Sequence, residues 1–274
     1  MHLLIRRLSF GTASSYFFTL YRITVYTLRR PPMAHYIPKL PAIVHAIDTE
    51  TKALRPNAYI LSMGGSTFDI ATLTLLGCTY VAVDPNDPEA DKIFDTDSST
   101  VAWWNGEGDP AFAPTPEAKQ AAWSGTTKID VALKIVVEYF EQFKKFDSVL
   151  VSRGPEFDMP IMCNALVACN VFQGIFRKFS ACESDRTVER LMLAFGLDMN
   201  QAVEEHNWVG KGQWVEHHPS FDSARSAYRT ARAYHLAHIA KNYGFEKMLI
   251  AHKALCEGTY NPALGYKGEF NGAG

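Results

Sequence analysis

Three β-rich runs follow one another along the chain, and they constrain the fold more than any other feature. Residues 42–48 (AIVHAID), 59–69 (YILSMGGSTFD) and 73–83 (LTLLGCTYVAV) are rich in β-branched and aromatic residues and are joined by brief connections. Consecutive strands with short connections usually pair as neighbours. They therefore predict an antiparallel meander at one edge of a sheet. The Gly64–Gly65 pair predicts a bulge or a close approach of another backbone.

The rest of the chain alternates between helical and strand patterns. Apolar residues at helical spacing follow Thr127, a suitable N-cap, as far as residues 144–145. A short helix is expected near 99–104, within an acidic connection at 84–109 that we expect to be exposed. The remaining elements are predicted as strands at 147–152 and near 179–183, and as helices at 157–169, 185–195 and 220–242, the last opened by Pro219. The fold class is therefore α/β, one mixed sheet with helices packed on its faces.

Residues 1–32 differ in composition from the rest of the chain, since they carry five arginines and no acid. This composition is typical of an organelle-targeting peptide, and it also fits sequence upstream of a true start at Met33. The apolar run 16–21 is far shorter than the roughly 20 residues of a membrane span. We therefore expect a non-core extension at 1–32, a single domain at 33–262 and a flexible, glycine-rich tail at 263–274.

Charge and cysteine content narrow the class of function. Without residues 1–32 the chain has 22 basic and 29 acidic residues, a net charge of −7. Such a body is poorly suited to coating nucleic acid by bulk charge, but it permits an enzyme that binds one strand end with the help of metal ions. The five cysteines form no C-x-x-C pair, which favours reduced thiols and a cytoplasmic location.

Three short motifs place carboxylates at the ends of predicted elements. Asp48 and Glu50 are two positions apart at the end of the first strand, so their side chains share one face. Asp158 lies at a strand-to-helix junction, and Asp222 lies about one turn into the last long helix. Neighbouring carboxylates repel each other unless a cation lies between them, and oxygen ligands are those that Mg²⁺ and Mn²⁺ prefer. Each motif alone also fits a helix cap or a solvated acid.

Taken together, the patterns D-x-E, R-G-x-x-F-D-x-P-I and H-x-x-x-x-D resemble the three exonuclease motifs of the DEDDh superfamily. The Trp103-Trp104 dipeptide and the Arg186-Thr187 step resemble its phage exonuclease A and 3′→5′ exoribonuclease branch, although Ser184 stands where that branch usually has an acid. The likeness covers about residues 42–240. It implies a ribonuclease H-like fold, a mixed five-stranded sheet with strands one to three antiparallel and the later strands parallel, flanked by helices.

The resemblance implies a 3′→5′ exonuclease that uses two Mg²⁺ or Mn²⁺ ions and releases nucleoside 5′-monophosphates from 3′ ends of single-stranded DNA or RNA. Asp48 would bridge the two ions, Glu50 and Asp222 would complete the first site, and Asp158 would reach the second. His217 would be the general base, because an imidazole with a pKa near 6.5 can accept a proton near neutral pH.

Several side chains near the motifs are candidates for gripping the strand end: Thr51, Leu54, Trp103, Trp104, Phe157 and Arg186. Aromatic stacking tolerates any base, but the tryptophans could equally pack the acidic connection onto the core. Arg153 and Arg186 could pair with phosphates or form structural ion pairs instead.

Other expectations concern activity, assembly and location. A catalytically inactive, nucleic-acid-binding relative is the alternative function, although it would be expected to lack one of the five motif residues. We also expect a homodimer, no membrane partner, and a cytoplasmic location (the host cytoplasm for a phage-encoded protein). The motifs do not distinguish DNA from RNA.

Overall fold

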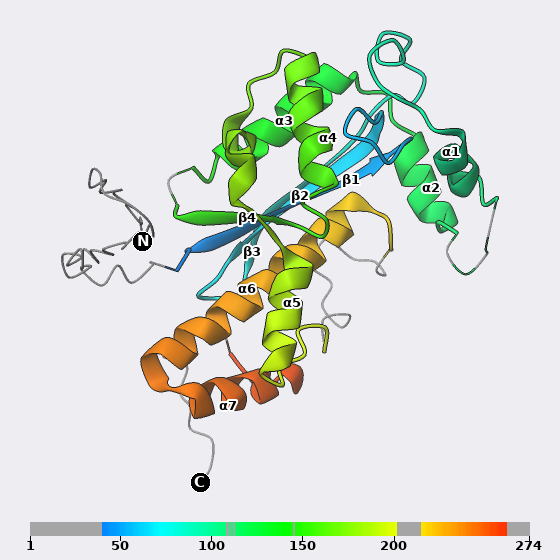
Figure 1. Ribbon diagram of the computed structural model, residues 1–274. Coiled ribbons are helices and arrows are strands. Elements are labelled where there is room, and N and C mark those ends of the chain that lie inside the picture. The colour runs from blue at the N-terminus through cyan, green and yellow to red at the C-terminus, as the bar shows by residue number, and fades with distance from the viewer. Residues whose placement is uncertain are drawn as a thin grey trace, which may run out of the picture. The chain divides into compact units, whose positions relative to one another are not determined.

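A mixed five-stranded sheet, in the order β3-β2-β1-β4-β5, forms the centre of the molecule (Figure 1). The computed structural model describes residues 40–107, 109, 111, 113–144, 146–201 and 215–261. The elements below belong to a compact unit that begins at Leu40. The expected extension at 1–32 and the expected tail at 263–274 lie outside the described residues.

The strands confirm the predicted meander and its parallel continuation. Strand β1 (Ile43–Thr51) pairs antiparallel with β2 (Ile60–Asp69), which pairs antiparallel with β3 (Leu75–Ala82). On its other side β1 pairs parallel with β4 (Ser148–Ser152), and β4 pairs parallel with β5 (Cys182–Ser184). β1 is therefore the central strand, with side chains directed to both faces.

Two helical layers cover the two faces of the sheet (Figure 1). One face carries α3 (Ile129–Glu141), α4 (Asp158–Ala168) and the 3-10 helix η2 (Gly174–Ala181). The other face carries α5 (Asp185–Ala194) and α6 (Pro219–Tyr243), and α7 (Phe245–Cys256) packs against α6. Because side chains alternate along a strand, Ile47 packs in the first layer's core and Val44 and Ala46 pack in the second. Asp48 and Glu50 continue the second set and so face α6.

The segment between β3 and α3 is more ordered than expected. It contains α1 (Ser98–Trp104) and α2 (Pro116–Trp123), which pack Trp104 and Ala122 against Leu61 of β2. Ala90 and Phe94 are also buried in the main core. The short helix expected near 99–104 is confirmed as α1. The expectation of an exposed connection at 84–109 is wrong for Ala90, Phe94 and Trp104, because their apolar side chains pack into the core.

The predicted start of α3 is also wrong. The helix begins at Ile129 with Lys128 at its N-cap, and no side chain caps it. Thr127 instead forms a β-bridge with Val83, and its carbonyl accepts a hydrogen bond from Asp84 N–H. Thr127 thus makes a tertiary contact with the end of β3 rather than capping the helix as the local sequence pattern predicted.

Gly64 confirms the predicted close backbone approach. A Cβ built at this position would lie 2.2 Å from the carbonyl carbon of Pro219 and 2.5 Å from Ser220 N. Real Cβ atoms do not approach backbone this closely, so only glycine lets the start of α6 lie against β2.

None of the helices in the described residues has the length and apolar character of a membrane span.

Candidate active site

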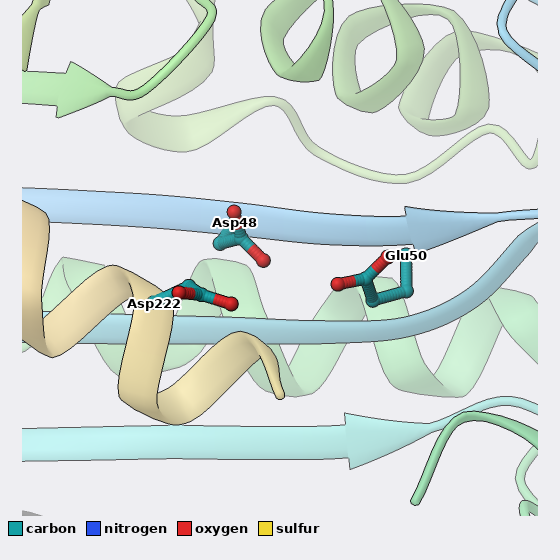
Figure 2. A group of neighbouring side chains, drawn as sticks. All are labelled: Asp48, Glu50 and Asp222. Atoms are coloured by element: carbon teal, nitrogen blue, oxygen red, sulfur yellow. The ribbon is translucent and has the colours of Figure 1, made fainter. Parts of the chain in front are cut away.

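Three carboxylates from two elements meet between the end of β1 and the start of α6. Asp48 and Glu50 project from β1 and Asp222 projects from the first turn of α6 (Figure 2). One oxygen of each carboxylate lies within 4.8 Å of the others. The structure therefore brings together three of the four acids that the motifs single out.

The start of α6 sets the position of Asp222. Pro219 occupies the first turn, where its missing N–H is harmless. The His218 side chain is the N-cap and accepts a hydrogen bond from Ser220 N–H at 3.3 Å, while its ring stacks on Tyr80 with centroids 4.6 Å apart. The contacts of His218 thus hold the start of α6 in place. Gly64 allows this helix start to approach the sheet.

Asp158 reaches the same strand end from the opposite layer. It begins α4 and is 3% exposed. Its Oδ1 accepts hydrogen bonds from the backbone N–H and the hydroxyl of Thr49, at 3.1 and 2.8 Å. Thr49 lies between Asp48 and Glu50, so Asp158 is held next to the three-acid cluster without being part of it. Glu156, two residues earlier, is exposed.

Burial disfavours the charged form of all four acids, and repulsion by neighbouring carboxylates adds to this at Asp48 and Glu50. Burial raises the pKa of Asp48 well above its ordinary value, and the Asp222, Asp158 and Glu50 charges raise it further. Burial likewise raises the pKa of Glu50 to about 7 and that of Asp158 to about 7. The pKa of Asp222 is raised by burial, although Arg225 opposes this from 3.2 Å.

This donor set fits divalent cations. Carboxylate oxygens are hard ligands of the kind that Mg²⁺ and Mn²⁺ prefer, and a cation among them would remove the repulsion that raises their pKa values. Arg225 forms an ion pair with Asp222 at 3.2 Å. At Asp48, the charges of Asp222, Asp158 and Glu50 outweigh that of Arg225.

His217 lies beside the cluster in an unusual backbone conformation. Its φ is +61°, in the left-handed region that non-glycine residues rarely adopt. Its Nδ1 is 3.7 Å from Glu50 Oε1, and its ring meets the Trp103 ring edge-on at a centroid distance of 5.1 Å. The Glu50 carboxylate raises the pKa of His217, while burial opposes this. Of the two adjacent histidines, His217 is the one that faces the acids.

A cleft of about 400 Å³ opens next to His217 and Glu50. Five of the six side chains that we expect to grip the strand end line it: Thr51, Leu54, Trp103, Trp104 and Phe157. Leu54 is 74% exposed, whereas Trp104 is 1% exposed and donates its indole N–H to Thr51 O at 3.0 Å. Trp104 is therefore packed into the core, and Trp103 is the indole at the cleft wall beside His217.

Arg186 does not line this cleft and is exposed at the start of α5. Arg153 forms ion pairs with Asp185 and Glu189 at 3.7 and 3.8 Å, which fits the structural alternative considered for it. Sequence reasoning missed Ser99 and Thr100, which also line the cleft. They precede Trp103 and Trp104 by four residues, so helical spacing could have placed them on the same face.

Comparisons with known proteins identify the class and then the family. Residues 44–235, which include all five motif residues, match the 3′-5′ exoribonuclease Rv2179c-like domain. The protein class is therefore the DEDDh 3′-5′ exonuclease superfamily, which confirms the resemblance in the motifs. The chain belongs to the Rv2179c-like 3′-5′ exoribonuclease domain family. A comparison with curated protein sequences gave no match.

Solved structures with a similar chain path include several nucleases. The nuclease domain of 3′hExo, a DEDDh family member bound to rAMP, is 12% identical, with a TM-score of 0.45 over 70% of this chain and 91% of that one. Cell-death related nuclease 4 (CRN-4) has the same identity and TM-score, over 70% and 63% of the two chains. Zinc-bound E. coli ExoI with single-stranded DNA is 11% identical, with a TM-score of 0.43 over 76% and 42%.

Proposed function

We propose that this exonuclease uses two divalent cations to release nucleoside 5′-monophosphates from the 3′ ends of single-stranded DNA or RNA. The observation that carries the proposal is the convergence of the Asp48, Glu50 and Asp222 oxygens within 4.8 Å. Asp158 is close enough to raise the pKa of Asp48. Membership of a 3′-5′ exonuclease family supports the reaction and its polarity.

The four carboxylates of Asp48, Glu50, Asp158 and Asp222 would hold Mg²⁺ or Mn²⁺. When bound, such ions stabilise charge on the attacking and leaving oxygens of a phosphoryl transfer. His217 is in reach of the same space and would take a proton from the attacking water. Its contact with Glu50 at 3.7 Å and its edge-on packing against Trp103 would orient the imidazole.

The cleft beside His217 would hold the terminal nucleotide. Leu54, Trp103 and Phe157 offer apolar and aromatic surface within it, and stacking of a base on such surface contributes about 1–3 kcal/mol without sequence preference. Thr51 and Trp104 would support this wall, because Trp104 N–H bonds the Thr51 carbonyl. Arg186 would contact phosphate only further along the strand, since it is outside the cleft.

Location and assembly belong to the same proposal. The five cysteines are unpaired, which suits a reducing compartment such as the cytoplasm. A homodimer remains a prediction that a light-scattering mass measurement would test.

The decisive experiment follows labelled products over time. DNA and RNA oligomers labelled at the 3′ or 5′ end are incubated with the protein and Mg²⁺ or Mn²⁺. We expect immediate release of the 3′ label as a mononucleotide, a descending ladder from 5′-labelled strands, and no products in EDTA. Cleavage that persists in EDTA would rule out the cation mechanism.

Variants separate the site from the fold. Asp48→Asn and Asp222→Asn should each abolish product formation, whereas Glu156→Gln, an exposed acid near Asp158, should retain it. Near-normal activity in either Asn variant would refute the site assignment. If the wild-type protein binds the oligomers but yields no products with either ion, the inactive nucleic-acid-binding relative becomes the better description.

A further inference from the structure

Thr49 lies between the two acids of β1 and faces the opposite side of the sheet. Because side chains alternate along a strand, Asp48 and Glu50 face α6, whereas Thr49 faces the layer that contains α4. Thr49 is 4% exposed, and Asp158, the first residue of α4, is 3% exposed. Three consecutive residues of β1 therefore supply two carboxylates of the proposed site and contact a third.

Both donor groups of Thr49 bind the same oxygen of Asp158. The backbone N–H and the hydroxyl of Thr49 donate to Oδ1 at 3.1 and 2.8 Å. The register between β1 and β4 ends at Ala46 and Val151, so Thr49 lies beyond it and Asp158 takes the place of a β4 partner for this N–H. Hydrogen bonds to an ionised carboxylate are short and strong. Two of them on one oxygen restrict the rotation of the carboxylate and so set the direction of Oδ2.

The hydroxyl is the feature of Thr49 that packing does not explain. Any residue other than proline at this position offers the backbone N–H, and valine would fill nearly the same volume and suits a buried strand equally well. A buried hydroxyl is unfavourable unless it forms a hydrogen bond. At Thr49 that bond goes to one of the four proposed ligands, which indicates a role in holding the ligand.

Asp158 reaches the proposed cation site from a different layer than the other acids. The oxygens of Asp48, Glu50 and Asp222 converge within 4.8 Å, and Asp158 is outside this group. We propose that Thr49 is a positioning residue, whose hydroxyl holds the Asp158 carboxylate in place for the second divalent cation. This inference rests on the proposed function. Removal of a partner that orients a metal ligand typically changes cation affinity or activity by roughly 10- to 100-fold.

Mn²⁺ binding by the full-length protein tests this role without relying on catalysis. The EPR signal of free Mn²⁺ gives the number of bound ions and their affinities, with adenosine 5′-monophosphate added as a model of the product. We expect two ions in the wild-type protein. In Thr49→Val the weaker ion should bind roughly 10- to 100-fold less tightly. The tighter ion should bind as in the wild-type protein, because Asp48, Glu50 and Asp222 keep their positions.

Further variants separate the hydroxyl of Thr49 from its surroundings. Thr49→Ser keeps the hydroxyl and should bind the weaker ion as the wild-type protein does. Thr67→Val is the matched control, because Thr67 is a buried threonine of β2 whose hydroxyl bonds His45 and Tyr139. This control should lower stability and leave both Mn²⁺ affinities unchanged. Thr49→Ala takes the place of Thr49→Val if circular dichroism shows that the valine variant does not fold.

The outcomes distinguish this inference from the proposed function. Wild-type affinities for both ions in Thr49→Val would overturn the inference and leave the proposed function intact, as would equally weak binding in Thr49→Ser and Thr49→Val. An equal loss in Thr67→Val would show that any missing buried hydroxyl has the same effect, and it would also overturn the inference. A wild-type protein that binds fewer than two Mn²⁺ ions would refute the two-cation function on which the inference rests.

Discussion

At the residue scale, the acids of the proposed site are held in an arrangement that opposes their own ionisation. Asp48 is flanked by Glu50, Asp158 and Asp222, and all four have pKa values raised chiefly by burial. Such groups lower the stability of the fold while they create affinity for a cation. The arrangement is therefore explained by ligand binding and not by stability.

Asp48→Asn should separate these two effects. It removes one charge and keeps the side-chain shape, so in EDTA we expect the free energy of unfolding to rise by roughly 1–2 kcal/mol. Urea unfolding measures this rise. A variant less stable than wild type in EDTA would show that Asp48 has an attractive partner in the free protein.

Gly64→Ala tests the contact that positions α6. The added Cβ would meet the backbone of Pro219 and Ser220 within 2.2–2.5 Å, so the helix start must move. We expect a loss of about 1–3 kcal/mol of stability and at least a tenfold loss of nuclease activity. Gly77→Ala is the matched control on β3, because its Cβ would make an ordinary 3.4 Å contact with Tyr139. Equal effects in both variants would contradict this role.

Much of the candidate site could be predicted from the sequence, because the resemblance of the three motifs to a known superfamily singles out Asp48, Glu50, Asp158, His217 and Asp222, and strand alternation places Asp48 and Glu50 on one face. The arrangement of the two tryptophans at the cleft wall could not be predicted from the sequence. Trp103 and Trp104 are equivalent in sequence, and only packing against Leu61 and the bond to the Thr51 carbonyl decide which indole is buried.

At the element scale, a network of buried and partly buried ions joins α5, α6 and the loop before α4. Arg229 of α6 pairs with Glu189 of α5 at 2.9 Å, and Arg153 contacts Glu189 and Asp185. Ser226 donates to Asp185 at 2.6 Å one turn after Asp222. The network thus fixes α6 along its length where it crosses the sheet.

Glu189→Ala should disrupt this docking. It leaves two arginines without one of their carboxylates, so we expect about 2–4 kcal/mol of destabilisation by urea unfolding. Lys134→Ala breaks an exposed i,i+4 pair with Asp130 and should cost under about 0.5 kcal/mol. Similar losses in both variants would mean that the buried network adds no more than a surface pair.

The elements were predictable where pattern and burial agree. The strands of the meander and the helix opened by Pro219 follow directly from apolar runs and a proline at the first turn. Helices α2 and α7 were not predicted, although Thr115-Pro116-Glu117 has the signs of a helix start. In α7, Met248, Ala251 and Leu255 are buried at helical spacing, a pattern that could have predicted this helix within the domain expected at 33–262.

At the scale of the whole molecule, pH should act on stability through buried neutral histidines. Burial lowers the pKa of His45 from 6.5 to about 4. As pH falls, the unfolded chain therefore binds this proton first, and stability is lost between about pH 6.5 and pH 4. We expect His45 to account for roughly 2 kcal/mol of the change between about pH 7 and pH 5. In the His45→Asn variant, the free energy of unfolding should fall less between these two pH values, because the contribution of His45 is absent; urea unfolding measures the difference.

Carboxylates with raised pKa act with the opposite sign in a similar window. Glu50 and Asp158 take up protons in the folded state first as pH falls through about 7, so their contribution rises on acidification. The wild-type protein and the His45→Asn variant share this carboxylate contribution, so it cancels when their changes in stability with pH are compared. The same pH dependence in wild type and His45→Asn would refute the assignment to His45.

A protein that begins at Met33 should be folded and active. The compact unit with all motif residues begins at Leu40, so removal of residues 1–32 takes away none of the contacts described above. Thermal unfolding within about 2 °C of the full-length chain and an unchanged specific activity are expected. Aggregation of the shorter protein would show that residues 1–32 contribute to the fold.

The proposed site draws on both helical layers, since Asp158 belongs to the α4 layer and Asp222 to the α6 layer, with β1 between them. An intermediate with only one layer docked would hold an incomplete set of carboxylates. Recovery of cleavage during refolding should then follow the slower of the two docking steps, whereas secondary structure would return earlier. A kinetic lag between circular dichroism and activity would therefore measure how independently the two halves of the core assemble.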